Sequence, residues 1–311
     1  MPKAAKISFI NFKGGVAKTT TAVNFAATLA ERGYATLLVD LDPQSNSTQW
    51  LLGENRGTQR IQNEPAKTVY RMFLDRIKKT HYFRFADSVV KAVAQTGLGM
   101  SLTPNLDLLP NTYRSIALEQ EMSAKGIGID EILKLQLEDV QNSYRFMIFD
   151  CPPNIYRTTQ NALIFSNYFI IPVYPDYFAD IGLQILCQQV DDIWSDIGQH
   201  SDDDLELLGV LITRIKENAT LEPGRRVLFE RRLSDIKADP QITNHPIFAH
   251  AEVFEPYFND SVEVSRSIDA FIPTIYHRRS YPPIKRYIQR MNEFTDLVLE
   301  KVRKRFPWVK K

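Results

Sequence analysis

Short apolar segments alternate along this chain with longer segments that have a helical period. The short segments are apolar on both sides and predict buried strands at 5–10, 35–39, 106–109, 145–149, 168–173 and 206–212. Helices are predicted at 18–32, 178–197 and 282–305. Strands that alternate with helices favour an α/β fold, with a mostly parallel sheet and helices on both faces. Residues 53–66 and 95–105, rich in Gly, Asn, Thr and Pro, are predicted loops.

The composition and the lengths of the apolar segments indicate the class of protein and its compartment. The chain has 311 residues, of which 44% are hydrophobic and 24% charged, which is typical of a globular protein. Cys151 and Cys187 are the two cysteines, too few for a disulfide framework and typical of a reducing compartment. No segment has the apolar length of a signal peptide or a membrane span, so we expect a cytoplasmic protein.

The segment "NFKGGVAKTTTA", residues 11–22, follows the first predicted strand and opens the first predicted helix. A loop in this position presents backbone N–H groups and a helix N-terminus to an anion. Gly14 and Gly15 allow close approach to phosphate oxygens, Lys18 can neutralise the β- and γ-phosphates, and Thr19 has the hydroxyl that such loops place on Mg²⁺. The segment therefore predicts a phosphate-binding loop.

This loop departs from the ordinary phosphate-loop pattern in two ways. Phe12 and Ala17 occupy the positions at which that pattern has glycine, and an additional lysine, Lys13, lies five residues before Lys18. Lys13 is either an exposed loop lysine or a second phosphate ligand. The motif alone leaves both interpretations open.

Acidic residues follow two other predicted strands. Asp150 ends the strand "FMIF", and Asp40 and Asp42 follow the strand at 35–39 with a spacing that puts both on one side if the strand continues. The carboxyl edge of a parallel sheet is where α/β proteins bind ligands. Carboxylates there can hold Mg²⁺-bound water or orient an attacking water, although an aspartate at a strand end is often only a helix cap.

The motifs "KGGVAKTT", "LLVDLDPQ" and "FDCPPN" resemble the deviant phosphate loop, switch I and switch II of the ParA/MinD ATPase family, especially its ParA partition and cargo-positioning members. The segment "NLDLLPNT" at 105–112 resembles another recurring segment of that family. The match is specific through about residue 215. It implies one phosphate-loop ATPase domain over 1–311, which hydrolyses ATP with Mg²⁺ at a weak basal rate that a partner stimulates.

The resemblance also implies roles for individual residues. Lys13 would reach the phosphates of a second subunit, so that ATP binding makes a homodimer. Asp42 would orient the attacking water and contact Mg²⁺ through water, Asp150 would support the metal through water, and Asp40 would be a supporting group. The implied ATP ligands are Lys13, Gly14, Gly15, Val16, Ala17, Lys18, Thr19, Thr20, Thr213 and Arg214.

Positive charge gathers toward the C-terminus. Residues 278–311 hold eleven Lys and Arg against three Asp and Glu, so this helical region is basic. The resemblance implies non-specific binding of duplex DNA through phosphate contacts. The candidates are Arg225, Arg226, Arg278, Arg279, Lys285, Arg286 and Arg290. The other interpretation is a solvated basic face paired with acidic neighbours.

These features lead to three hypotheses. The first is a nucleoid-associated switch ATPase that positions a cargo with a ParB-like or cargo-bound adaptor. The second is a MinD-like ATPase that docks on anionic lipid through its basic C-terminus, where "RFPWVKK" supplies Trp308 at the interface. We expect no membrane, because the apolar stripe of the last helix is needed for the core. The third is a metabolic phosphate-loop enzyme, for which we find no substrate motif near switch II.

Overall fold

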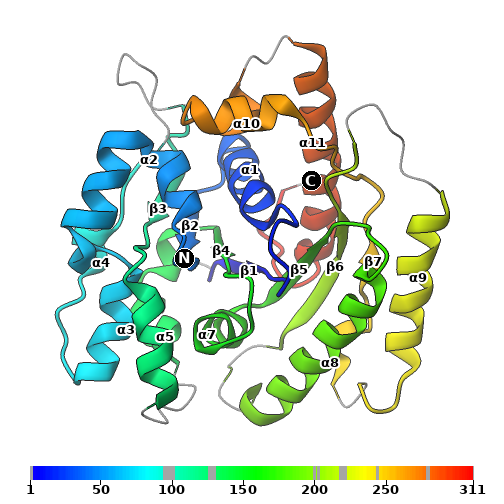
Figure 1. Cartoon of the computed structure of the whole chain (residues 1–311), viewed down its shortest axis with the longest axis horizontal. Helices are drawn as coiled ribbons and strands as arrows, with labels where there is room; N and C mark the ends of the chain where they lie inside the picture. Colours follow the sequence, from blue (N-terminus) through cyan, green and yellow to red (C-terminus); the bar gives the residue numbers. More distant parts are fainter. Residues whose placement is uncertain are drawn as a thin grey trace.

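The computed structural model describes residues 3–93, 102–124, 131–198, 201, 204–216, 223–242, 245–277 and 281–310. Seven parallel strands form one sheet in the order β3-β2-β4-β1-β5-β6-β7 (Figure 1). The strands are β1 Ala5–Phe9, β2 Thr36–Asp40, β3 Leu106–Leu109, β4 Phe146–Asp150, β5 Tyr168–Val173, β6 Glu206–Ile212 and β7 Glu252–Val253. The parallel α/β fold and its six predicted strands are confirmed to within one residue at each end.

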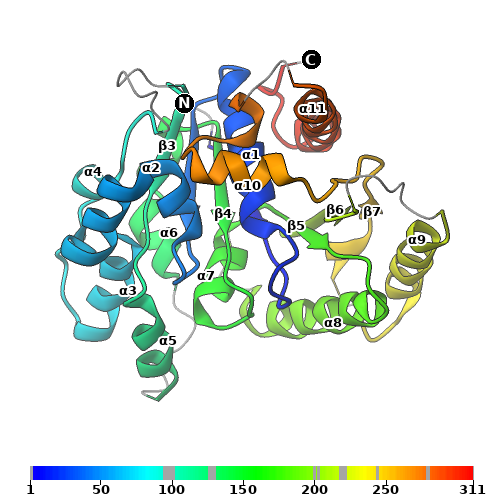
Figure 2. The same cartoon turned by 45° about the horizontal axis from the view of Figure 1, so that its top comes forward.

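Helices cover both faces of this sheet. They are α1 Lys18–Glu31, α2 Asn46–Thr58, α3 Val69–Lys78, α4 Phe85–Ser88, α5 Ser115–Ala124, α6 Ile132–Leu137, α7 Arg157–Phe165, α8 Ala179–Ile197, α9 Pro223–Ala238, α10 Val262–Asp269 and α11 Pro282–Arg303. Figure 2 shows α1, α10 and α11 on one face and α3, α5, α7 and α8 on the other. No helix among the described residues combines the length and the apolarity that crossing a bilayer requires.

The alternation of side chains along each strand separates two hydrophobic layers. In β4, Phe146 and Ile148 join the layer under α1 and α11, whereas Met147 and Phe149 join the layer under α3, α5, α6, α7 and α8. Helix α1 is buried on nearly all sides because α11 covers it from outside. The apolar stripe predicted for the last helix, including Tyr287 and Met291, packs in this layer and is confirmed as core.

Two predictions about irregular structure are corrected. Residues 53–66 are not a loop: α2 continues to Thr58 across a kink at Gly53 and is followed by a π-helical turn, Gln59–Asn63, and a 3-10 turn, Pro65–Lys67. The polar composition led to the wrong loop prediction because this segment lies on the surface, where a helix needs few apolar residues. Of the second predicted loop, residues 95–101 lie outside the described part of the chain.

The sequence analysis missed β7. This two-residue strand pairs with β6, and a Cβ atom at Gly209 would lie 2.5 Å from the Glu252 carbonyl oxygen. A glycine inside an apolar strand pattern often indicates such a close approach of a second backbone.

Candidate nucleotide site

The phosphate loop joins the end of β1 to the start of α1 at the carboxyl edge of the sheet. Gly15 and Ala17 have positive φ angles of 72° and 59°. The left-handed conformation costs a residue with a side chain about 1–2 kcal/mol, so Ala17 is strained there, and a glycine at this position would avoid that cost. The Asn11 side chain fixes the start of the loop, because its amide donates to Pro172 O at 2.8 Å and its oxygen accepts from Lys13 N at 2.9 Å.

Residues just after β6 support the loop from behind. Thr213 is fully buried, and its hydroxyl lies 3.0 Å from the carbonyl oxygens of Val16 and Val173. The Arg214 guanidinium donates to Gly15 O at 2.8 Å. Thr213 therefore holds the loop through its backbone, and Arg214 lies at the outer rim. Both lie against the loop, and their contact with nucleotide stays a prediction.

Lys18 begins α1 and lies buried at the floor of the loop. Its ammonium lies 3.2 Å from Lys13 O. Burial lowers the pKa of Lys18, and the negative charges of Asp150 and Asp42 oppose that shift. A cation held in this low-dielectric position interacts with an arriving polyphosphate far more strongly than an exposed lysine does.

The acidic residues come together because β2, β4 and β1 are neighbours. Asp40 and Asp150 are register partners across β2 and β4. Asp40 is fully buried, and its carboxylate accepts from Thr48 N at 2.9 Å, Thr48 Oγ1 at 2.6 Å and Asp42 N at 3.1 Å. Asp40 therefore orders the segment that carries Asp42, and its role in the site stays a prediction.

Asp150 offers a carboxylate oxygen, the type of ligand that Mg²⁺ prefers. Its Oδ2 accepts from Ser47 Oγ at 2.6 Å, whereas its buried Oδ1 has no hydrogen-bond partner among the described residues. Burial raises the pKa of Asp150 to about 6, and the Asp42 charge adds to that shift while hydrogen bonds from Ser47 and Thr19 oppose it. An unpartnered carboxylate oxygen next to a threonine hydroxyl fits a hydrated Mg²⁺ ion.

Asp42 lies in the turn after β2, because the strand ends at Asp40 rather than continuing. Its carboxylate accepts from Gln44 N at 2.8 Å and is 7% exposed. Burial raises the pKa of Asp42, whereas the nearby Lys18 charge lowers it. The predicted residues Lys18, Asp42 and Asp150 thus belong to one electrostatic cluster.

Lys13 differs from Lys18 in exposure. Its side chain is 43% exposed and forms an ion pair with Asp176, in the segment between β5 and α8. The two lysines of the loop therefore occupy different environments: Lys18 faces the acidic cluster inside the subunit, and Lys13 lies at its surface.

A cavity of about 240 Å³ adjoins the phosphate loop on the Arg214 side. Among the residues that line it are three that the sequence analysis missed: Phe258, Asn259 and Asp260. No local sequence pattern indicates them, because they reach the loop through a tertiary contact: Ile215 N donates to Phe258 O at 3.1 Å, which brings together residues 43 positions apart in the chain. The remaining walls are Gly15, Ala17, Thr20, Thr21, Arg214, Val264, Ser265, Ile268 and Tyr287.

Known proteins are similar to this chain in sequence and in fold. The family model AAA_31, described as an AAA domain, matches residues 4–203. The sporulation initiation inhibitor protein Soj of Bacillus subtilis is 35% identical over 69% of this chain and 74% of its own length. The chromosome-partitioning ATPase Soj of Thermus thermophilus is 30% identical over 76% of this chain and 77% of its own.

The chain belongs to the ParA/MinD-type ATPases. It is therefore an ATPase. Among solved structures, apo McdA of Cyanothece superposes over 95% of this chain and 99% of its own with a TM-score of 0.66 at 18% identity, which shows the shared fold. Cobyrinic acid a,c-diamide synthase of Mycobacterium smegmatis, solved with an ATP analogue and magnesium, covers 72% of this chain and 77% of its own with a TM-score of 0.55 at 28% identity.

The basic residues of this ParA/MinD-type chain have unequal surroundings. Arg226 on α9 donates to Val253 O at 2.8 Å and pairs with Glu230 and Glu255, so its guanidinium is already engaged. Arg290 lies over the Tyr257 ring and donates to Asn259. Lys285 and Arg286 are exposed on α11. Arg225 is half-buried on α9, and Arg278 and Arg279 lie outside the described residues.

Trp308 packs inward rather than presenting its ring to a lipid interface. Its ring lies 5.4 Å from Phe146 and 5.7 Å from Phe306, and Arg145 lies 5.2 Å above it. The membrane hypothesis therefore loses the side chain on which it depended.

Proposed function

We propose that this ATPase is a nucleotide-dependent dimerising switch that binds duplex DNA without sequence preference and positions a cargo with an adaptor. Its cofactor is ATP with Mg²⁺, and its stimulated hydrolysis releases the DNA. The Thermus relative is named a chromosome-partitioning ATPase, which supports the cargo class. Nucleoid association follows from the DNA binding.

One observation carries the proposal: the phosphate loop, Asp42 and Asp150 meet at the ends of three neighbouring strands. Lys18 and the loop N–H groups would hold the phosphates, and Asp150 with Thr19 would hold Mg²⁺. The metal would neutralise charge on the phosphates. Asp42 would orient the attacking water, because its carboxylate is held by Gln44 N near Lys18.

The position of Lys13 supports the dimer. An exposed lysine beside the phosphate loop, 43% exposed and held only by an ion pair at the surface, can exchange Asp176 for a stronger anion. The phosphates bound to a second subunit are such an anion. Two subunits that meet through this face would bury the phosphates between them.

The exposed part of α11 supports DNA binding. Lys285 and Arg286 have no recorded acidic partner within the described residues, whereas Arg226 and Arg290 are engaged in contacts inside the subunit. We therefore place the DNA-binding role first on Lys285 and Arg286, followed by Arg225. A two-fold dimer doubles these contacts on one particle, which makes DNA binding depend on ATP.

Cosedimentation with duplex DNA and with anionic vesicles, each with ATP or ADP, tests whether the protein binds DNA and whether this binding depends on ATP. We expect DNA pelleting with ATP only, and loss of pelleting in the Lys285→Glu/Arg286→Glu variant while ATP affinity stays unchanged. Each lost phosphate contact lowers the slope of log affinity against log salt by about 0.9. The matched control is Glu293→Lys/Glu300→Lys, which raises the charge elsewhere on α11. DNA binding that is equal in ADP, or pelleting with vesicles only, would contradict the proposal.

A further inference from the structure

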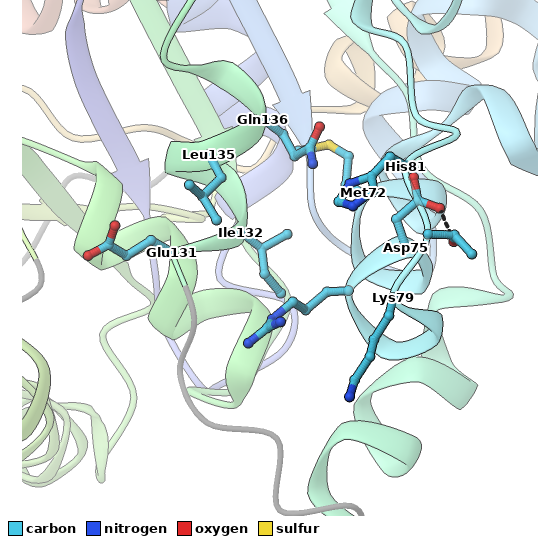
Figure 3. A pocket seen from close by; sticks show the side chains of 10 residues that line it. Met72, Asp75, Lys79, His81, Glu131, Ile132, Leu135 and Gln136 are labelled. Atoms are coloured by element: carbon cyan, nitrogen blue, oxygen red, sulfur yellow. Dashed lines mark hydrogen bonds between the residues drawn. The ribbon is translucent and has the colours of Figure 1, made fainter.

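A second pocket lies on the opposite face of the sheet from α1, between α3 and α6 (Figure 3). Its volume is about 570 Å³, within the range of roughly 300–1,000 Å³ of small-molecule sites. We call it the α3/α6 pocket. None of the residues of the candidate nucleotide site lines it; its walls are Met72, Asp75, Arg76, Lys79, Thr80, His81, Glu131, Ile132, Leu135 and Gln136.

The α3/α6 pocket has an apolar floor. Met72 and Ile132 are buried, and Figure 3 shows Ile132, Leu135 and Gln136 on the α6 side across from Met72, Asp75 and His81 on the α3 side. Leu135 is 68% exposed, although it borders this floor. An exposed leucine next to a concave apolar surface gains free energy when an apolar group covers both.

The rim of the pocket carries basic side chains. Lys79 and His81 are exposed, and neither forms an ion pair among the described residues. The acidic walls are already neutralised: Asp75 pairs with Arg71 and accepts from Thr80 Oγ1 at 2.6 Å, and Glu131 pairs with Lys134 at 3.3 Å. The pocket therefore favours an anion over a cation.

Both walls connect to strand ends that carry the nucleotide site. Val69, the first residue of α3, donates its N–H to Pro110 O at 2.9 Å. Asn111, which follows Pro110, donates its N–H to Thr48 Oγ1, and this hydroxyl donates to Asp40. On the other side, Ile132 N donates to Asn161 Oδ1 of α7, the helix that follows Asp150 and its loop. A ligand that fixes the spacing of α3 and α6 would thus act on both segments.

We propose that the α3/α6 pocket binds a small organic anion with an apolar body, such as an aromatic carboxylate or sulfonate, and that its occupancy changes the affinity for ATP. The apolar body covers Met72, Ile132 and Leu135, and the anionic group pairs with Lys79. The coupling rests on the proposed ATP binding, whereas the anion site itself does not. By linkage, ATP changes the affinity for the anion by the same factor.

The probe for the test is 8-anilinonaphthalene-1-sulfonate, whose fluorescence rises when its rings leave water. Without nucleotide, we expect one saturable site on the full chain. Lys79→Glu should weaken probe binding by roughly tenfold or more, because it replaces a charge-assisted contact with repulsion. Leu135→Asp should weaken it similarly, and both positions are exposed, so the fold should be kept; circular dichroism checks this.

Two control variants make the result specific. Lys78→Glu makes the same charge change one residue away, at a lysine that pairs with Glu121 outside the pocket, and should leave probe affinity unchanged. Ile181→Asp alters an exposed apolar side chain on α8 and should also leave it unchanged. Loss of probe binding in Ile181→Asp, or equal losses in Lys78→Glu and Lys79→Glu, would overturn the anion site.

ATP affinity is then measured with and without saturating probe. A several-fold change that disappears in Lys79→Glu supports the coupling, and an unchanged ATP affinity overturns it. If the wild type binds the probe but no ATP in either condition, the proposed function fails and the anion site remains.

Discussion

Two lysines five residues apart in the phosphate loop have different electrostatic surroundings. Lys18 is buried beside Asp42 and Asp150, and burial lowers its pKa. Lys13 is largely exposed and pairs with Asp176. The sequence shows only that both are lysines, so their separate roles follow from where the loop places each ammonium group.

Lys18→Gln should abolish ATP binding. The neutral amide removes charge-assisted hydrogen bonds to phosphate that contribute about 1.5–3 kcal/mol each, so we expect ATP affinity to fall by roughly 100-fold or more. Isothermal titration calorimetry with Mg²⁺-ATP measures this. Lys78→Gln, at an exposed lysine of α3, is the matched control. An affinity near that of the wild type would remove Lys18 from the site.

The contribution of Asp150 to the stability of the nucleotide-free protein should fall as pH rises from about 4 to above 6. Burial raises the pKa of Asp150 from 3.8 to about 6, so in this window the folded protein holds a proton that the unfolded chain has released. The stabilisation is complete below pH 3.8 and is lost as pH rises through about 6. Each pH unit in this window contributes about 1.4 kcal/mol.

Urea unfolding at several pH values measures this dependence. Asp150→Asn, which cannot ionise, should flatten the curve by an amount on the order of 3 kcal/mol between pH 4 and 6.5. Asp139→Asn, at an exposed aspartate outside the nucleotide site, is the control and should keep the slope. Equal slopes in the wild type and in Asp150→Asn would contradict the raised pKa.

At the scale of elements, α9 and α11 carry basic residues in different surroundings. The Arg226 guanidinium attaches α9 to the segment around β7 through the carbonyl oxygens of Val253, Phe254 and Glu255. On α11, the apolar stripe packs over α1 while Lys285 and Arg286 face outward. Helical periodicity predicted the stripe correctly, whereas the partners of each arginine depend on the neighbouring elements.

Arg226→Ala should destabilise the fold. Three backbone carbonyl groups lose a charged donor, and we expect the free energy of unfolding to fall by about 2–3 kcal/mol. Chemical denaturation measures it, with Arg231→Ala on the exposed side of the same helix as the control, where the change should stay within about 0.5 kcal/mol. Equal small effects in both variants would show that the contacts of Arg226 with the segment around β7 do not stabilise the fold.

At the scale of the whole molecule, the phosphate-loop face is the expected dimer surface. Lys13→Ala should bind ATP with nearly unchanged affinity, because Lys18 remains, but it should dimerise and hydrolyse ATP poorly. Light scattering with excess ATP measures the mass, and Lys78→Ala is the control. Normal ATP-dependent dimerisation of Lys13→Ala would make it a loop lysine that pairs with Asp176.

The sequence by itself determined the α/β class, six of the seven strands and the residues of the phosphate loop. These features are local: strand apolarity, helical period and a glycine-lysine loop depend on nearby residues. The sequence also predicted that Asp42 and Asp150 lie near the loop, because parallel strands end at one edge.

Only the tertiary structure decided the rest. Strand order makes Asp40 and Asp150 register partners, and burial at this edge of the sheet raises the pKa of Asp150, whose Oδ1 has no hydrogen-bond partner among the described residues. Contacts between segments far apart in the chain bring Phe258 and Asp260 to the loop and engage Arg226 inside the subunit. Such properties depend on burial and on which groups meet across the fold, and no local pattern encodes either.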